Sequence, residues 1–207
     1  KRLFDVVLAA SLLLLLSPIM LAVALAVLVV HGRPIFFFQQ RPGLHGKLFT
    51  IYKFRTMTER HDQAGNQLAD GMRLTRLGAV LRSLSLDELP ELVNVLKGDM
   101  SLVGPRPLLV EYLPHYTTEE RCRHDVRPGI TGLAQIHGRN HVPWDERLAL
   151  DVWYVNNRSL ALDIHILFKT IWAVVKKDGV SADPDQAETN LREERSQVAG
   201  EAAPEQV

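Results

Sequence analysis

The sequence predicts a mainly helical α+β protein whose N-terminal segment is anchored in a membrane. Three observations lead to this prediction. An apolar run of 25 residues without a charge extends from Val6 to Val30, two runs rich in β-branched and aromatic residues flank a turn, and several later stretches carry apolar residues at helical spacing. The expected parts are a membrane anchor (residues 1–33), a cytoplasmic domain (34–182) and a disordered acidic tail (183–207).

The composition fits one domain and excludes several classes of protein. The chain has 207 residues with 24 basic and 24 acidic side chains, so its net charge indicates no partner. Residues 183–207 hold seven acids, two bases and no aromatic residue, a composition that predicts disorder. The single cysteine, Cys122, excludes an internal disulfide and a cysteine-based zinc site.

The apolar run is long enough to cross a membrane, because a straight helix of this length spans roughly 37 Å. A signal peptide fits the basic start, but the run is too long for one and no cleavage site follows it. Hydropathy alone therefore favours a plain transmembrane helix.

Two features favour instead a re-entrant helix that enters and leaves the same leaflet. Pro18, in the middle of the run, removes a backbone donor and is expected to kink or break the helix, while the Ser17 hydroxyl can bond a freed carbonyl. Basic residues flank both ends of the run, which places both flanks in the cytoplasm. They are Lys1 and Arg2 before it, and Arg33, Arg41, Lys47, Lys53 and Arg55 after it. A spanning helix with a proline kink is the alternative.

The remaining elements follow in order. A β-hairpin is expected from residues 35–40 and 48–54, helices over 74–83, 89–96, 119–125, 144–156 and 164–177, an extended segment over 103–108, and turns at 128–132 and 138–140. In residues 164–177 the apolar residues form one stripe and Lys169, Lys176 and Lys177 lie off it. This pattern is typical both of an amphipathic helix at a membrane interface and of a surface helix that faces the core.

The segment SLDELP at residues 85–90 is the strongest candidate for chemistry. Ser85 or Asp87 can cap the following helix, and Ser85 with Glu88 fits a capping box. Both carboxylates then lie at a helix N-terminus, where the dipole favours ionisation, and Asp87 points away from the apolar stripe. An ionised, accessible aspartate can act as a nucleophile towards phosphorus. A solvated acidic helix cap is the alternative.

Cations are expected to face these two acids. Arg106 lies between Pro105 and Pro107, which fix the backbone and suit bidentate phosphate binding. Lys53 and Arg55 add positive charge. The combination of cations and two acids predicts a metal-bridged pyrophosphate.

Three ordered motifs resemble one known family. They are YKFRTM at residues 52–57, LRSLSLDELPELVNVLKGDMSLVGPRPLL at 81–109 and RHDVRPGITGLAQIHGRN at 123–140. Together with the Ser-Pro-broken apolar helix they resemble the bacterial sugar transferases, and more narrowly the small monotopic phosphoglycosyl transferases, over residues 1–181.

The resemblance implies a magnesium-dependent enzyme on the cytoplasmic face of the bacterial inner membrane, with both termini cytoplasmic. It would move a sugar-1-phosphate from a UDP-sugar to polyprenol (undecaprenyl) phosphate and release UMP, as the first membrane step of glycoconjugate biosynthesis. Downstream glycosyltransferases would be its partners. Asp87 would be the nucleophile that carries the phosphosugar, and Glu88 would help bind Mg²⁺ or take a proton. The metal site would be Asp87 and Glu88; the expected substrate-binding residues are Lys53, Arg55, Arg82, Arg106, Arg139 and Asp163.

Two other functions remain open from the sequence. A membrane-bound UDP-sugar pyrophosphatase would use the same anion site with water as acceptor. A non-catalytic membrane scaffold would explain the anchor but not the acids and cations around Asp87. Nucleic acid is not expected as a partner, because acids interleave with the arginines of residues 121–127, which predicts a solvated face.

Overall fold

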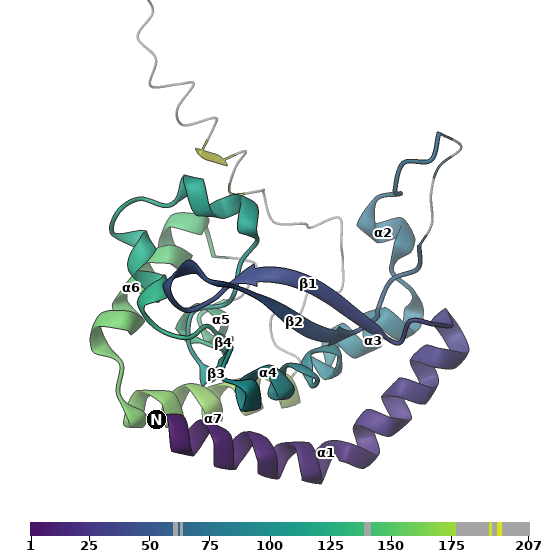
Figure 1. The fold of residues 1–207 in the computed structure, drawn as a ribbon, viewed down its shortest axis with the longest axis horizontal. Coiled ribbons are helices and arrows are strands. Elements are labelled where there is room, and N and C mark those ends of the chain that lie inside the picture. The colour runs from purple at the N-terminus through teal and green to yellow at the C-terminus, as the bar shows by residue number, and fades with distance from the viewer. Residues whose placement is uncertain (60–61, 63, 139–141, 177–190, 192–193, 196–207) are drawn as a thin grey trace, which may run out of the picture.

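The computed structural model describes the chain except residues 60–61, 63, 139–141, 177–190, 192–193 and 196–207 (Figure 1). The α-helices are α1 (Arg2–His31), α2 (Asp70–Arg73), α3 (Arg76–Ser83), α4 (Glu91–Lys97), α5 (Leu133–Ile136), α6 (Trp144–Asn157) and α7 (Leu160–Lys176). The strands are β1 (Phe36–Pro42), β2 (Leu48–Phe54), β3 (Ser101–Val103) and β4 (Gly129–Thr131). Short 3₁₀ helices are η1 (Leu44–Gly46), η2 (Leu86–Glu88), η3 (Val110–His115) and η4 (Glu120–Asp125). The expected mainly helical fold with a hairpin is confirmed.

Helix α1 stays continuous through Pro18 and bends between its ends (Figure 1). Proline has no N–H to donate to the carbonyl four residues earlier, which is that of Leu14. The Ser17 hydroxyl donates to this oxygen at 2.8 Å, so the freed acceptor is satisfied locally. The proline therefore gives a bent helix rather than two separate ones. Among the described helices, α1 alone is long and apolar enough to cross a membrane.

The first half of α1 is fixed to the rest of the domain by polar contacts. The Arg2 guanidinium donates to the carbonyls of Val95 at 2.6 Å and Leu96 at 3.0 Å, at the C-terminal end of α4. Asp5 is buried and accepts a hydrogen bond from the Ser101 hydroxyl at 2.9 Å. These bonds place the N-terminus of α1 against α4 and β3.

The second half of α1 returns to the same domain by apolar packing. Val23 and Val27 lie in a buried cluster with Phe54 of β2 and Leu81 of α3. The His31 ring then bonds the Thr75 hydroxyl at 2.8 Å. The middle of the helix has no such cover, since Leu14 is 79% exposed and Leu15 is 72% exposed.

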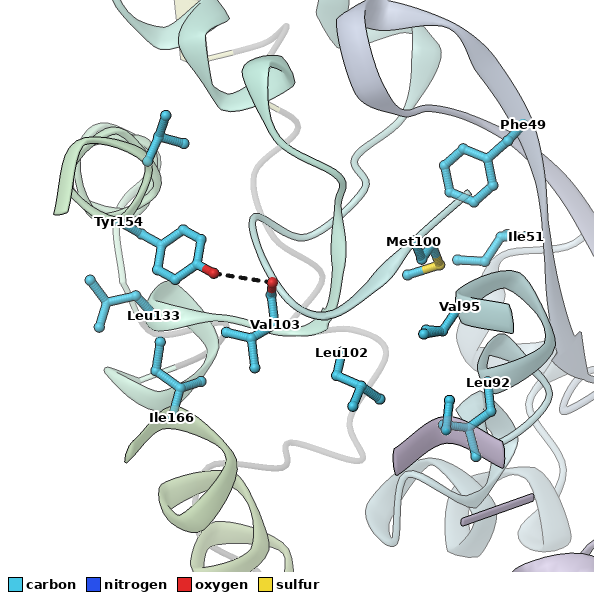
Figure 2. Packing of buried hydrophobic residues seen from close by; sticks show 12 residues of the cluster. Phe49, Ile51, Leu92, Val95, Met100, Leu102, Val103, Leu133, Tyr154 and Ile166 are labelled. Atoms are coloured by element: carbon cyan, nitrogen blue, oxygen red, sulfur yellow. Dashed lines mark hydrogen bonds between the residues drawn. The ribbon is translucent and has the colours of Figure 1, made fainter. Parts of the chain in front are cut away.

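The hairpin of β1 and β2 covers α4 with one face. Its antiparallel register pairs residues 36–42 with 54–48. Phe49 and Ile51 project towards Leu92 and Val95 of α4, as Figure 2 shows. This packing follows from the period of two in a strand, which puts alternate residues on one face.

The segment 128–132, expected to be a turn, contains strand β4 instead. It pairs in parallel with β3, with Ser101 opposite Gly129 and Val103 opposite Thr131. The glycine permits close approach of two backbones: a Cβ on Gly129 would lie 2.1 Å from the nitrogen of Gly104. The expected turn over residues 128–132 is therefore wrong.

Helices α5, α6 and α7 pack on the other side of β3. Figure 2 shows Leu133, Tyr154 and Ile166 on this side, and the Tyr154 hydroxyl lies within hydrogen-bonding distance of the Val103 carbonyl, at 3.1 Å. Of the apolar stripe of α7, Leu167 packs against this core, whereas Phe168, Ile171 and Trp172 are 60–70% exposed. Most of that stripe therefore faces outward, against the core-facing alternative.

The predicted tail is described only at residues 191, 194 and 195. Leu191 is buried in a second cluster with Trp144 and Leu148, and Arg195 contacts Glu120 and Asp145 at 2.7 Å each. The rest of residues 183–207 lies outside the described residues.

Helix α3 approaches the segment after β2 so closely that one position requires glycine. A Cβ on Gly78 would lie 1.9 Å from the Thr56 carbonyl oxygen. Alanine favours a helix over glycine by about 1 kcal/mol, whereas overpacking costs about 1–3 kcal/mol. We therefore expect Gly78→Ala to lower the melting temperature in detergent micelles. The exposed Val80→Ala change in the same helix is the control, and a more stable Gly78→Ala protein would contradict the packing argument.

Candidate active site

The hairpin directs Lys53 at the two acids of the SLDELP segment. Lys53 lies on the same face of β2 as Phe49 and Ile51, two residues beyond the part that packs on α4. Its ammonium nitrogen therefore reaches the start of that helix, at 2.7 Å from Glu88 Oε1 and 3.2 Å from Glu91 Oε1. The contact between Lys53 and Glu91 is an ion pair without hydrogen-bonding geometry.

The acids lie on a tight turn between α3 and α4. Ser85 adopts the left-handed conformation (φ 54°, ψ 24°), which is unfavourable for a residue other than glycine. The chain then makes the 3₁₀ turn η2 and enters α4 at Glu91. The expected capping box is wrong: neither η2 nor α4, both fully described, has a side-chain cap. The Glu88 carboxylate is used for ion pairs instead.

Glu88 connects two cations from distant parts of the chain. Its Oε1 atom accepts hydrogen bonds from Lys53 Nζ at 2.7 Å and from Arg106 Nη2 at 2.8 Å. Arg106 comes from the loop after β3, so three separate segments meet at one oxygen. The expected grouping of Arg106 and Lys53 around the acidic pair is present in the structure.

Burial and these cations set the charge of Glu88. Burial alone would raise its pKa, but Arg106 and Lys53 outweigh burial, and the pKa of Glu88 lies well below its usual value. Glu88 is therefore a firmly ionised carboxylate. Such a group organises cations well and accepts a proton poorly near neutral pH.

Asp87 has a different environment from that of Glu88. Its residue is only 7% exposed, so the expectation of an accessible side chain is wrong. Burial, with a contribution from the Glu88 charge, raises the pKa of Asp87 against the opposing effects of Lys53, Arg82 and Arg106. A helix dipole was expected to stabilise the ionised form of Asp87, but burial has the larger effect and disfavours that form. Within the described residues, the Asp87 carboxylate has no hydrogen-bond partner.

Glu91 is a third carboxyl group of this cluster, and the sequence interpretation missed it. Burial raises the pKa of Glu91 to about 7, the Glu88 charge adds to the shift, and Lys53 opposes it. The signal was present, because Glu91 lies three residues after Glu88, a spacing that places side chains together on a helix. Arg41 was also missed as a nearby cation: burial and repulsion by Arg106 lower its pKa to about 10.

The other predicted site residues have other surroundings. Arg82 lies close enough to influence Asp87 and donates to the Thr56 hydroxyl at 3.2 Å. Arg55 contacts the Met57 carbonyl at 3.1 Å and Glu59 at 3.4 Å. Among the described residues, no contact is found between Arg55 and the carboxylates of the site. Arg139 lies outside the described residues.

Asp163 does not join the carboxylate cluster. Its buried carboxylate accepts hydrogen bonds from Lys1 Nζ and from the Tyr154 hydroxyl, both at 2.6 Å. It therefore ties the start of α1 to α6 and α7. The expected solvated face at residues 121–127 is also wrong in one position: Arg123 is 3% exposed and pairs with Asp151 at 2.7 Å.

The donor set fits magnesium only when phosphate oxygens complete its shell. In the described part of the chain, no group of three or more His, Cys, Asp or Glu side chains is arranged to hold a metal. Mg²⁺ commonly uses one or two carboxylates together with waters and substrate phosphates. Asp87, with no hydrogen-bond partner in the described part of the chain, and the neighbouring Glu88 provide such a pair.

Known proteins are similar to this chain over most of its length. The chain is 56% identical over 180 residues to the "uncharacterized sugar transferase EpsL" of Bacillus subtilis, which covers 87% of this chain and 89% of that protein. It is 41% identical over 196 residues to the "undecaprenyl-phosphate galactose phosphotransferase" of Salmonella typhimurium, covering 86% of this chain and 41% of the relative. It is 41% identical over 182 residues to the "UDP-glucose:undecaprenyl-phosphate glucose-1-phosphate transferase" of Klebsiella pneumoniae, covering 83% of this chain and 39% of the relative.

The relatives define the class of protein, and a family model identifies the family. The chain is a transferase, and its apolar helix α1 indicates association with a membrane. The family model described as "Bacterial sugar transferase" matches residues 1–177. The chain therefore belongs to the bacterial sugar transferase family. It spans about two fifths of the length of the Salmonella and Klebsiella relatives.

The raised pKa of Glu91 predicts a pH-dependent loss of stability. Between its usual pKa of 4.5 and about 7, the folded protein holds a proton that the unfolded chain releases, so stability falls as pH rises through this interval. Glu91→Gln removes this dependence. Between pH 4.5 and about 7, the melting temperature of Glu91→Gln should rise relative to that of the wild type, and the difference should stay constant from there to pH 8. Glu111→Gln, at an exposed site, is the control; parallel wild-type and Glu91→Gln profiles would contradict the assignment.

Proposed function

We propose that this chain transfers a sugar-1-phosphate from a UDP-sugar to undecaprenyl phosphate. The observation that carries the proposal is the buried Asp87 carboxylate beside Glu88, which is bonded to Lys53 and Arg106. The names of the Salmonella and Klebsiella relatives support the acceptor, and the Klebsiella name supports a UDP-sugar donor. UMP is the other product of the proposed transfer.

The transfer proceeds in two displacements at one phosphorus atom. An ionised oxygen of Asp87 attacks the phosphorus that bears the sugar, and the bond from that phosphorus to the oxygen of UMP breaks. UMP leaves with the electron pair, and the sugar phosphate remains on Asp87. A phosphate oxygen of undecaprenyl phosphate then attacks the same phosphorus and releases the carboxylate, which gives a lipid-linked diphosphosugar. Splitting the transfer into two steps is the usual advantage of a covalent intermediate.

The buried cluster supports this chemistry electrostatically. A carboxylate with little hydration has a raised pKa and loses little solvent on attack, so Asp87 suits a nucleophile. Arg106 and Lys53 stabilise negative charge as it moves to the leaving UMP. Because Glu88 is firmly ionised, its low pKa supports a role in holding these cations rather than in taking a proton from the acceptor.

Magnesium would be held by Asp87 and Glu88 together with oxygens of the pyrophosphate. When bound, it supplies neutralisation of phosphate charge.

The membrane arrangement is part of the proposal. Both ends of α1 contact the same domain, through Arg2 at one end and His31 at the other, while its exposed middle is apolar. A straight spanning helix would carry its ends to opposite sides of the bilayer, so these contacts support a re-entrant helix. Both flanks then lie on the cytoplasmic face of the inner membrane, where the outward stripe of α7 also meets the lipid interface.

Replacing the nucleophile should abolish transfer without unfolding the protein. Asp87→Asn removes the attacking charge, and a neutral side chain is tolerated in a site where burial already disfavours that charge. We expect no lipid-linked product and no phosphosugar adduct on the peptide containing Asp87, with an unchanged melting temperature. Asp70→Asn, on an exposed ion pair, is the control. Normal turnover by Asp87→Asn would exclude the covalent route.

The products of the wild-type chain separate the alternative functions. With a panel of UDP-sugars and undecaprenyl phosphate, a transferase releases UMP and forms a lipid-linked diphosphosugar. A pyrophosphatase releases sugar-1-phosphate without lipid, and a scaffold gives neither product. Either of the last two results would refute the proposed function.

The position of the N-terminus tests the re-entrant helix. With Cys122 replaced, we place single cysteines before Lys1 or at Asn66, and treat intact cells with an impermeant thiol reagent. Both should stay protected until the inner membrane is permeabilised. Labelling of the first cysteine alone would show that α1 spans the membrane. Replacing Ser17 and Pro18 by leucine should straighten the helix, expose the first cysteine to the reagent and reduce transfer.

A further inference from the structure

Arg123 is a buried cation outside the carboxylate cluster. It lies on η4, and its side chain is 2% exposed. Its guanidinium donates to Asp151 Oδ2 from Nη2 at 2.7 Å and from Nε at 3.2 Å, and to the Tyr116 hydroxyl from Nη1 at 2.9 Å. The Nη2 group also donates to the main-chain carbonyl of Arg106 at 2.8 Å. One side chain thus connects α6 to the residue that binds Glu88.

The Arg106 segment depends on such outside contacts. Pro105 and Pro107 have no backbone N–H, so the loop cannot form the regular hydrogen bonds of a strand. Before Arg106, β4 holds the loop: Gly104 N–H donates to the Thr131 carbonyl at 2.9 Å, and Gly129 N–H donates to the Pro105 carbonyl at 3.0 Å. At Arg106 itself, Arg123 bonds the carbonyl, while the guanidinium of Arg106 bonds Glu88 at 2.8 Å.

Stability alone does not account for this buried pair. Two charges lose their hydration on burial, so an ion pair of this kind gives little advantage over apolar residues of the same size. The guanidinium keeps its charge: burial would lower the pKa of Arg123, but Asp151 and Tyr116 outweigh burial and the net shift is upward. What an apolar pair could not provide is a charged donor to the Arg106 carbonyl.

We propose that Arg123, oriented by Asp151, is a positioning residue that fixes the Arg106 backbone so that the Arg106 guanidinium stays directed at Glu88 and at the phosphates of the donor. The path runs from Asp151 through Arg123 to the Arg106 carbonyl, and from the Arg106 side chain to Glu88. The inference rests on the proposed function for the role of Arg106 towards phosphate. It requires no contact between Arg123 and the substrate.

The test is a cycle of four proteins: the wild type, Arg123→Lys, Arg106→Ala and the double variant. Lysine keeps the charge opposite Asp151 but cannot reproduce the planar set of donors. Because a misplacement of about 1 Å can cost ~100-fold in rate, Arg123→Lys should lower kcat strongly. It should also raise the KM for the UDP-sugar, since Arg106 is proposed to bind the donor phosphates. In the Arg106→Ala background, the same change should have almost no effect. Equal fold-losses in both backgrounds would show a merely structural role and overturn the proposal.

Tyr116→Phe is the matched control. It removes a different hydrogen bond of the same guanidinium and leaves the donor to the Arg106 carbonyl in place, so kcat should stay near the wild-type value. A loss as large as that of Arg123→Lys would contradict the proposal. Should Arg123→Lys fail to fold, as judged by melting temperature, Asp151→Glu takes its place in the cycle. This variant keeps the charge but displaces the guanidinium, and the same coupling to Arg106→Ala is expected.

The cycle also separates this inference from the proposed function. Absence of lipid-linked product from the wild type would refute the proposed function. The positioning role of Arg123 can then still be tested by measuring binding. The four proteins are then compared by their affinity for UDP. Loss of affinity in Arg123→Lys that disappears in the Arg106→Ala background supports positioning, and equal losses in both backgrounds overturn it.

Discussion

The Glu88 carboxylate is the contact on which the rest of the site depends. Its Oε1 atom accepts hydrogen bonds from Lys53 of the hairpin and from Arg106 of the loop after β3, so it joins three segments that are separate in the sequence. The hydrophobic packing of β2 on α4 brings Lys53 to this place, and the β3–β4 pairing brings Arg106. The Glu88 charge also adds to the raised pKa of the neighbouring Asp87, for which burial is the largest cause.

Patterns with a fixed period predicted the fold well. The hairpin, α3, α4, α6 and α7 follow from strand and helix spacing, and Gly98 ends α4 in the left-handed conformation, as its position suggests. Strand β4 was not predictable in this way. It has only three residues, and its glycine serves a close approach of two backbones that are distant in the sequence. A glycine in the local sequence indicates a turn as readily as it indicates the close approach of two backbones.

The sequence predicted which residues form the candidate site better than it predicted how they are arranged. Asp87, Glu88, Lys53 and Arg106 come together as expected, but Asp87 is buried rather than exposed. The expectation that Asp87 points away from the apolar stripe failed because it treats the whole segment as one helix. The left-handed Ser85 and the 3₁₀ turn η2 change the direction of the side chains before α4 begins. Glu91, the first residue of α4, lies three residues after Glu88 of η2; this short spacing places side chains together in a 3₁₀ turn as well as in an α-helix, so it was a usable signal.

The attachment of α1 at both ends has a consequence for how the enzyme meets its lipid. A domain held by one flexible anchor can tilt freely, and its site faces the bilayer for only part of the time. Contacts at Arg2 and at His31 restrict this tilt, because they join the helix to the domain at two separated places. In the proposed re-entrant arrangement, the remaining freedom is rotation and drift in the plane of the membrane. The proposed acceptor, a lipid-borne phosphate that moves in that plane, would then approach the site from a constant direction, so an encounter would require a search in two dimensions rather than three.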